Sequence, residues 1–415
     1  MIMSKIYLRK GREESLKRFH PWVFSGAIES IDKSAKEGDI LQIFSYNDEF
    51  LGCGHYQIGS IALRILSFDK SALESSFWLN RITEAHNLRC ALGIAFKTDE
   101  GANSSPKSQG TNSYRLIHGE GDMLPGLIID LYNGVAVIQS HSAGMFLSRD
   151  KITAALRELY GDNLKAVYDK SASTAPFKAS LNLEEGYLYQ REDFDENDCI
   201  IKENGHLFKV DWREGQKTGF FLDQRENRAM VQRFSKGRRV LNLFCYTGGF
   251  SVYALAGGAL SVDSVDSSAK AIELLEKNIE LNRAERGSVP IAPHNAYCTD
   301  AIEFIKSKRE DAYDLIVVDP PAFAKHRGAL SNALRAYQRL NYSAFTAIAP
   351  GGIIFTYSCS QVVDKVSFAE AVFSAAAQSG RRVRVIDRLT QPGDHPVNIF
   401  HPEGEYLKGL VLFVE

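Results

Sequence analysis

The sequence predicts an α/β fold with a parallel sheet in its C-terminal half, preceded by a small β-barrel and a mixed α+β region. After residue 224, apolar runs alternate with helical stretches, which is the rhythm of a parallel sheet covered by helices. Residues 5–68 contain closely spaced β-prone runs broken by turn residues, which favour a small barrel. The region between them, 114–215, mixes strand-like runs with one helix-like segment.

Length and composition predict a globular protein. The chain has 415 residues, of which 44% are hydrophobic and 24% charged, so we expect two or three domains that each bury a core. The six cysteines include no Cys-x-x-Cys pair, so we expect neither a disulfide framework nor a metal site. The N-terminus lacks an apolar signal segment, and no run of apolar residues is long enough to span a membrane. We therefore expect a cytoplasmic location and no membrane partner.

The N-terminal barrel carries a local basic surface, although the net charge of the chain is only −2. Residues 5–18 hold six basic against two acidic side chains, with Phe19, His20 and Trp22 just beyond. Such a cluster can face phosphates of a nucleic acid, and a solvated rim around a core tryptophan is the alternative. The expected strands are 6–8, 22–24, 39–44, 50–52 and 61–66.

The middle region begins with a predicted helix over 76–92, followed by a polar run at 97–113 that has too little apolar surface to pack. Asn133-Gly134 lies between two β-prone runs and indicates a type I′ hairpin. The expected elements are strands at 127–132, 134–139 and 207–210, and a helix at 149–160.

The C-terminal region shows the clearest helix, at 268–282, where Ile272, Leu275 and Ile279 form one apolar stripe. Ser267 or Ser268 is its expected N-cap. The expected strands are 240–244, 260–266, 315–319, 353–357, 383–386 and 409–414.

A glycine turn follows the first of these strands. In the run 243–250, LFCYTGGF, we expect Phe244, Tyr246, Thr247 and Gly248 to face a ligand at the start of a helix. Asp266 ends the next strand, at the distance that lets a carboxylate accept both ribose hydroxyls. Together they predict an adenosine-containing cofactor, whereas the glycines alone can equally serve packing. The turn lacks G-x-G-x-x-G spacing, which disfavours NAD.

Asp300 precedes another helical stretch, 301–306. Its carboxylate is placed to accept a hydrogen bond from an exocyclic amine such as adenine N6. The alternative is a plain helix N-cap.

A buried strand ends in the run 319–323, DPPAF. Its prolines stiffen the loop and remove N–H donors, so Asp319 and nearby carbonyls face the cleft at the carboxyl end of the strand. We assign Pro320, Pro321 and Phe323 to substrate binding, because many nucleic-acid methyltransferases grip a planar base with an Asp/Asn-Pro-Pro-aromatic run. A purely structural turn is the alternative.

Cys359 ends the following strand within the run 358–360, SCS. In the usual methyltransferase sheet, the strands ending in Asp319 and Cys359 are neighbours, so thiol and carboxylate would face one substrate. An inert buried cysteine is the alternative.

These motifs resemble the ribosomal RNA large subunit methyltransferase I family, which forms 5-methylcytosine in 23S ribosomal RNA with S-adenosylmethionine. The resemblance covers nearly the whole chain. It rests on 215–225 (GQKTGFFLDQR), 246–250 (YTGGF), 319–323, 358–360, 394–396 (DHP) and 403–409 (EGEYLKG).

The resemblance implies a PUA-like RNA-binding domain at 1–73, a central β-rich α+β domain at 74–214 and a class I, Rossmann-like methyltransferase domain at 215–415. It also implies that Cys359 is the nucleophile and Asp319 the acid that recognises the base. The chain differs from many methyltransferases in having Asn242 where they carry an acid, and the 97–113 loop resembles an insertion.

The implied mechanism is covalent. The Cys359 thiolate adds to C6 of cytosine and raises electron density at C5, while Asp319 stabilises the developing charge at N3 and the amine. Nearby positive groups or the cofactor's sulfonium should lower the pKa of the thiol; Lys325, also assigned to substrate binding, and Arg335 are candidates for such groups. Gln224 is assigned to the cofactor pocket, with Phe220 or Phe221 against adenine or base.

Naked or partly assembled ribosomal RNA is the expected substrate, because the target base must leave its stack. Alternatives remain open at this stage. The enzyme could alkylate an exocyclic amine of a base, which needs no cysteine, or the chain could be a catalytically silent RNA-binding assembly protein. A homodimer is also left open.

Overall fold

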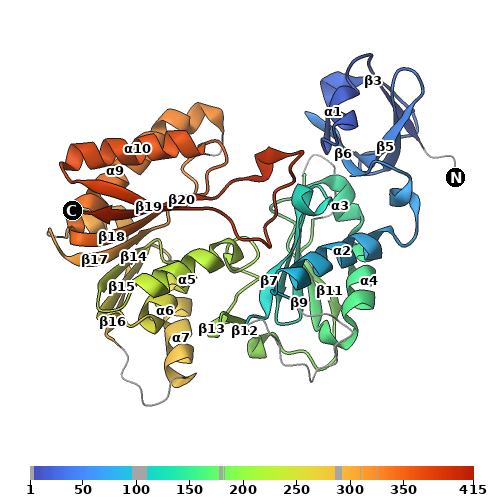
Figure 1. The fold of residues 1–415 in the computed structure, drawn as a ribbon. Coiled ribbons are helices and arrows are strands. Elements are labelled where there is room, and N and C mark those ends of the chain that lie inside the picture. The colour runs from blue at the N-terminus through green and yellow to red at the C-terminus, as the bar shows by residue number, and fades with distance from the viewer. Residues whose placement is uncertain are drawn as a thin grey trace. The chain divides into compact units, whose positions relative to one another are not determined.

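The computed structural model describes residues 4–95, 110–176, 181, 183–285, 292–308, 310–324 and 326–415. The chain forms two compact units (Figure 1). The N-terminal unit comprises Met1–Lys202, Val210–Leu222 and Gly393–Gly404, and the C-terminal unit comprises Glu203–Lys209, Asp223–Pro392 and Glu405–Glu415. The chain thus crosses between the units several times, and a division into three contiguous domains stays a prediction of the sequence.

The N-terminal unit begins with a six-stranded sheet of order β2-β6-β5-β4-β1-β3. Alternating apolar side chains, including Ile6, Leu8, Leu41 and Ile43, are fully buried on one face. All five expected strands are present, and the sequence missed β3. The elements are β1 (Lys5–Leu8), α1 (Glu14–Lys17), β2 (Trp22–Phe24), β3 (Ile28–Ile31), β4 (Ile40–Phe44), β5 (Phe50–Tyr56) and β6 (Ile61–Ser67).

A second sheet in this unit has the order β11-β10-β9-β8-β7. The expected Asn133-Gly134 hairpin joins β8 to β9, and both turn residues have positive φ, 49° and 87°, as type I′ requires. The elements are α2 (Phe77–Ala91), β7 (Ser113–His118), β8 (Leu127–Tyr132), β9 (Val135–Ser140), α3 (Ala143–Leu147), α4 (Arg149–Tyr160), β10 (Ala166–Asp169) and β11 (Gly186–Gln190).

The polar run expected at 97–113 falls mostly outside the described residues, which omit 96–109; its last residue already begins β7. Within the described residues, no helix combines the length and the apolar character that a membrane crossing needs.

The C-terminal unit is built on a seven-stranded sheet of order β16-β15-β14-β17-β18-β20-β19. The first five strands are parallel, and β20 lies antiparallel between β18 and β19. The strands are β14 (Arg239–Leu243), β15 (Ser261–Asp266), β16 (His294–Cys298), β17 (Tyr313–Val318), β18 (Ile348–Ser358), β19 (Val383–Leu389) and β20 (Lys408–Val414), and β12 (Ile200–Glu203) pairs with β13 (His206–Lys209) as a separate ribbon.

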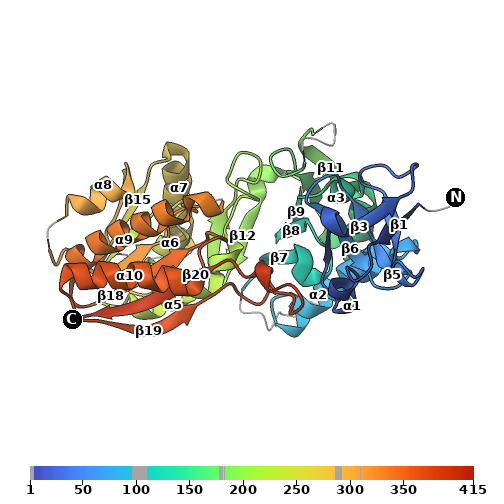
Figure 2. The same ribbon diagram turned by 90° about the horizontal axis from the view of Figure 1, so that it is seen from above.

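Helices cover both faces of this sheet. Figure 1 shows α9 and α10 on one face and α5, α6 and α7 on the other, and Figure 2 shows α8, α9 and α10 side by side. The stripe Ile272, Leu275 and Ile279 is buried as expected, and Ser268 Oγ caps the helix by accepting from Ala271 N. The helices are α5 (Arg225–Phe234), α6 (Gly249–Ala256), α7 (Ala269–Glu285), α8 (Ala301–Lys306), α9 (Leu330–Ala347) and α10 (Lys365–Ser379).

A buried ion pair joins α5 to the end of β12 within this unit. Arg228 Nε and Nη2 donate to the two carboxylate oxygens of Glu203 at 2.7 and 2.6 Å, and Tyr253 OH donates to the same carboxylate at 3.0 Å. The side chains of Arg228 and Glu203 are 3% and 0% exposed. The bidentate geometry satisfies both charges away from water.

We predict that Glu203→Gln destabilises the C-terminal unit by about 3–5 kcal/mol, because it leaves the Arg228 charge buried without its counter-ion. Hydrogen exchange of β14 peptides measures the opening of this unit directly. Glu273→Gln removes an exposed carboxylate that pairs with Lys277 on α7, and it should leave exchange unchanged. Equal protection in both variants would contradict the prediction.

Candidate active site

The site forms where β17 and β18 end. These strands are parallel neighbours, with Val318 opposite Thr356, so the prediction that Asp319 and Cys359 follow adjacent strands is confirmed. Cys359 Sγ lies 3.9 Å from the carbonyl oxygen of Pro320 and is partly exposed. Thiol and carboxyl therefore extend from the same edge of the sheet.

The loops that follow the two strands are hydrogen-bonded to each other. Ser360 Oγ accepts from Ala324 N at 3.3 Å and lies 3.2 Å from Tyr337 OH, and the Phe323 ring packs on Tyr337 with centroids 4.8 Å apart. Pro320 is buried, whereas Pro321 is exposed. These contacts between the loops restrict the positions of Asp319 and Cys359.

Asp319 is held by the residue that precedes α5. Gln224 Nε2 donates to Asp319 Oδ2 at 2.9 Å, and Asn227 Nδ2 donates to Gln224 Oε1 at 2.5 Å, which fixes the amide orientation. Burial and the nearby Asp223 carboxylate raise the pKa of Asp319 to about 7. The carboxyl can therefore exchange a proton near neutral pH. Gln224, expected at the cofactor, here orients the acid.

The environment of the Cys359 thiol differs from expectation. Burial and the carboxylates of Asp319 and Asp223 raise its pKa to about 12, against the weaker opposing effect of Lys408. The expectation that positive side chains lower the thiol pKa is wrong for this structure, chiefly because the thiol is buried. The expected effect of the cofactor's sulfonium stays a prediction. Arg335 is exposed, and Lys325 lies outside the described residues.

Lys408 and Asp223 were not singled out by the sequence reasoning. Lys408, at the start of β20, is buried and donates to the carbonyls of Ser360 and Val363, each at 2.6 Å; burial lowers its pKa to about 8. Asp223 Oδ2 accepts from Tyr406 OH at 2.7 Å. Lys408 and Tyr406 both lie in the 403–409 motif, so that motif was the signal in the sequence that could have pointed to these contacts.

Tyr357 lies between the glycine turn and the Asp319 carboxyl. It is fully buried, and its ring packs on Phe250 at 5.7 Å. Its hydroxyl and Asp223 Oδ1 have no hydrogen-bond partner among the described residues. A Cβ on Gly409 would meet the tyrosine ring at 2.6 Å, so glycine is required there. Buried polar atoms of this kind indicate a place for a polar ligand.

The glycine turn combines packing with an unusual backbone. A Cβ on Gly248 would meet Leu275 of α7 at 2.7 Å, so this glycine serves helix packing. Phe244 and Tyr246 nevertheless have positive φ, 57° and 47°, a backbone conformation that is uncommon for residues other than glycine. Asp266 stabilises the turn, because its two oxygens accept from Tyr246 N and Ser268 N, each at 2.9 Å.

Three further expected residues are placed as follows. Thr247 is buried, and its carbonyl accepts from Asn278 Nδ2 at 2.9 Å. Asp300 Oδ1 accepts from Ile302 N and Glu303 N, which is the N-cap alternative; its role toward adenine stays a prediction. Asn242 is buried and donates to Ser251 Oγ at 2.8 Å, so it links β14 to α6 on either side of the glycine turn.

The residues present fit a nucleoside cofactor. The carboxylate of Asp266 ends β15 beside a turn that precedes the N-terminus of α6, and each of its oxygens keeps an acceptor site for a ribose hydroxyl. The cofactor would supply an electrophilic group, and the edge carrying Asp319 and Cys359 would hold the acceptor.

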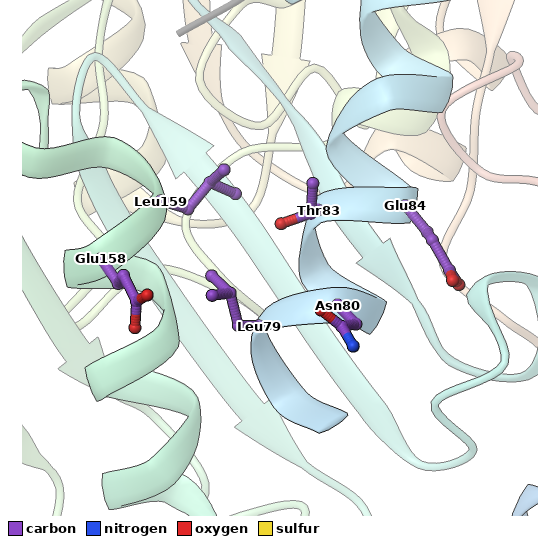
Figure 3. Close-up of a pocket in the computed structure, with 6 residues that line it drawn as sticks. All are labelled: Leu79, Asn80, Thr83, Glu84, Glu158 and Leu159. Carbon is purple, nitrogen blue, oxygen red and sulfur yellow. The ribbon is translucent and has the colours of Figure 1, made fainter. Parts of the chain in front are cut away.

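Other features do not contribute to this site. Phe220 is buried in the N-terminal unit, where its carbonyl accepts from Tyr132 OH at 3.2 Å; Phe221 is half-buried, and the role of both toward a base stays a prediction. A surface hollow between α2 and α4 is lined by Leu79, Asn80, Thr83, Glu84, Glu158 and Leu159. Figure 3 shows Leu79 and Leu159 between the two helices, and the residues that line the hollow include no cysteine, histidine or lysine.

Two family models match the chain. One, described as S-adenosylmethionine-dependent methyltransferase, matches residues 189–410, and one described as PUA-like domain matches residues 6–68. Ribosomal RNA large subunit methyltransferase I of Aeromonas hydrophila is 39% identical over 416 residues, which cover 99% of both chains. The protein of that name from Pseudoalteromonas atlantica is 38% identical over 412 residues, again 99% of both.

Solved structures show the same fold. A protein of Streptococcus mutans described as an S-adenosylmethionine-dependent methyltransferase matches with a TM-score of 0.78 at 24% identity, over 99% of this chain and 100% of that chain. The structure of SMU.776 in complex with SAH matches with a TM-score of 0.79, also at 24% identity and with the same coverage. These likenesses extend over both units.

We predict slow alkylation of Cys359 in the free protein. The pKa of Cys359 is raised to about 12, so its thiolate fraction at neutral pH is far below that of an ordinary cysteine. Iodoacetamide should therefore modify Cys359 at least about ten times more slowly than it modifies the exposed Cys298. Asp319→Asn removes a negative charge, lowers the thiol pKa and accelerates the reaction. Peptide mapping by mass spectrometry measures each rate. A Cys359 that reacts as fast as Cys298 would refute this assignment of charges.

Proposed function

Because the chain belongs to the ribosomal RNA large subunit methyltransferase I family and is an S-adenosylmethionine-dependent methyltransferase, we propose that it forms 5-methylcytosine in 23S ribosomal RNA. The observation that supports this most is the placement of Cys359 beside the Asp319 loop, with Sγ 3.9 Å from the Pro320 carbonyl. A thiol in that position suits attack on a ring carbon of a pyrimidine whose polar edge meets the carboxyl.

In the proposed reaction, Cys359 Sγ forms a bond to C6 of cytosine, and the thiol proton passes to Asp319. The raised pKa of Asp319, about 7, suits this exchange. The protonated carboxyl then donates to N3 as negative charge develops on the ring. Bound S-adenosylmethionine supplies an electrophilic methyl group, which is taken by C5.

The product forms when C5 loses its proton and the C6–S bond breaks, which returns the thiol. A base must accept the C5 proton. We propose Asp223 for this role, because its Oδ1 has no hydrogen-bond partner among the described residues and its charge acts on both Asp319 and Cys359. Tyr406 OH, which donates to Oδ2 at 2.7 Å, orients the carboxylate.

The cofactor would lie against the glycine turn and Asp266, where backbone N–H groups and carboxylate oxygens bind its polar ends. We propose that the RNA is naked or partly assembled, since the target base must be extruded from its stack. The basic stretch of the N-terminal domain, including Lys10, Arg12 and Arg18, is exposed and suits phosphate contacts. A ribosomal RNA substrate also agrees with the cytoplasmic location expected from the sequence.

Cys359→Ala tests the proposal against alkylation of an exocyclic amine. We expect loss of methylcytosine formation to below about 1% of the wild-type rate, because no other group can activate C5, with S-adenosylmethionine affinity retained in calorimetry. Mass spectrometry of digested ribosomal RNA gives the product. Cys90→Ala is the matched control, because Cys90 lies in the N-terminal unit beside His86.

A second readout traps the adduct. RNA that contains 5-fluorocytidine cannot lose a proton from C5, so the wild-type enzyme should remain covalently bound to it through Cys359. Retained turnover in Cys359→Ala favours the amine route. A wild-type chain that binds no S-adenosylmethionine favours a catalytically silent RNA-binding protein.

A further inference from the structure

A cluster of potential metal ligands lies in the N-terminal unit, apart from the residues assigned to methyl transfer. His20 precedes β2, whereas His401 and Glu403 belong to the segment Gly393–Gly404. One ligand atom from each of the three side chains lies within 4.8 Å of the others. Two imidazoles and a carboxylate therefore converge from distant parts of the chain.

The imidazole of His401 is buried without a hydrogen-bond partner among the described residues. Its side chain is 3% exposed, and neither ring nitrogen has a hydrogen-bond partner among the described residues. The Glu403 carboxylate lies 3.8 Å from Nε2, beyond hydrogen-bond distance. Buried ring nitrogens normally find a partner, so the arrangement is incomplete as it stands.

His20 is oriented by its own turn. Its Nδ1 accepts from Trp22 N at 3.2 Å and lies 3.3 Å from the carbonyl oxygen of the same residue, so both contacts hold the ring in the turn. In a metal-bound form Nδ1 would carry the proton and donate to that oxygen, which would leave the Nε2 lone pair for the ion. Trp22 itself is fixed, because its Nε1 donates to Glu120 Oε1 at 2.8 Å and its ring contacts His401 with centroids 4.3 Å apart. The two imidazole rings are 5.6 Å apart.

The surrounding charge favours a cation. The carboxylates of Glu120 and Glu403 both act on His401, and His20 is the opposing group. The Glu403 side chain is 54% exposed and can move toward an ion without disturbing the core. A divalent cation would meet two imidazole rings and a carboxylate, with a second carboxylate nearby.

We propose that His20, His401 and Glu403 bind one zinc ion. The ion would link the segment Gly393–Gly404 to the six-stranded sheet β1–β6, since His20 directly precedes β2. Imidazole nitrogen with carboxylate oxygen is a donor set that suits zinc, whereas calcium and magnesium prefer oxygen alone. Three protein ligands leave a fourth tetrahedral position for water. Closure of the site needs only small side-chain shifts, chiefly of Glu403.

The test uses the full chain after removal of metal with a chelator. Calorimetry with zinc chloride should give one bound ion, and cobalt, used as a spectroscopic substitute, should give the visible absorption of a low-symmetry site. His20→Ala and Glu403→Ala should each weaken zinc binding about tenfold or more. Both side chains are partly exposed, so these variants are expected to fold, which circular dichroism checks.

Controls separate this site from other zinc ligands. Glu14→Gln and His326→Ala remove exposed groups elsewhere and should leave affinity unchanged. Cys90→Ala tests the Cys90–His86 pair, in which Cys90 Sγ lies 3.4 Å from His86 Nε2. This variant should also leave the zinc affinity unchanged. Zinc should raise the thermal midpoint of the wild type but not of His20→Ala. The proposal is overturned if the wild-type chain binds no zinc, or if His20→Ala binds it as tightly as the wild type.

Discussion

The register of β17 against β18 is the constraint on which the candidate active site depends. Val318 opposite Thr356 places the two following loops at one edge of the sheet, and the Ala324–Ser360 hydrogen bond holds them together. A side-chain period of two along a strand means that a slip by one residue would turn the thiol and the carboxyl to different faces. Packing of the apolar core against one side of the sheet therefore also fixes which side chains meet at the edge that carries the candidate active site.

The surroundings of the thiol disfavour its reactive form. Burial, together with the Asp319 and Asp223 carboxyls, raises the pKa of Cys359 to about 12. A cationic cofactor and a base that engages Asp319 would both reverse the effect, by adding positive charge and by neutralising negative charge. Activation of the nucleophile is thus coupled to assembly of the complex, and the free thiol is protected from side reactions.

Much of this architecture is readable in the sequence. Long apolar runs, the apolar stripe on α7 and the Asn133-Gly134 turn each favour one kind of secondary structure over the others. The motifs at Asp319 and Cys359 indicate that the strands before them end next to each other. The strand β16 was missed because His294–Cys298 is a polar edge strand without apolar alternation.

The electrostatics could not be predicted in the same way. Lys408, Asp223 and Tyr406 lie in the sequence motifs, but the motifs do not say that these residues meet near Cys359. The pKa of the thiol depends on its burial and on which charges the fold places around it. Glycine roles are equally hidden: Gly248 resembles a cofactor residue in sequence, yet its missing Cβ makes room for Leu275. The His20–His401 cluster joins positions that sequence spacing cannot relate.

The antiparallel insertion of β20 between β18 and β19 gives the last strand an unusual importance. A chain shortened before residue 408 would leave the largely buried strand β18 and the mostly exposed strand β19 with unpaired backbone edges. Unpaired edges recruit strands from other molecules, so incomplete copies would aggregate. They would also lack Lys408, whose ammonium donates to the carbonyl of Ser360 next to Cys359.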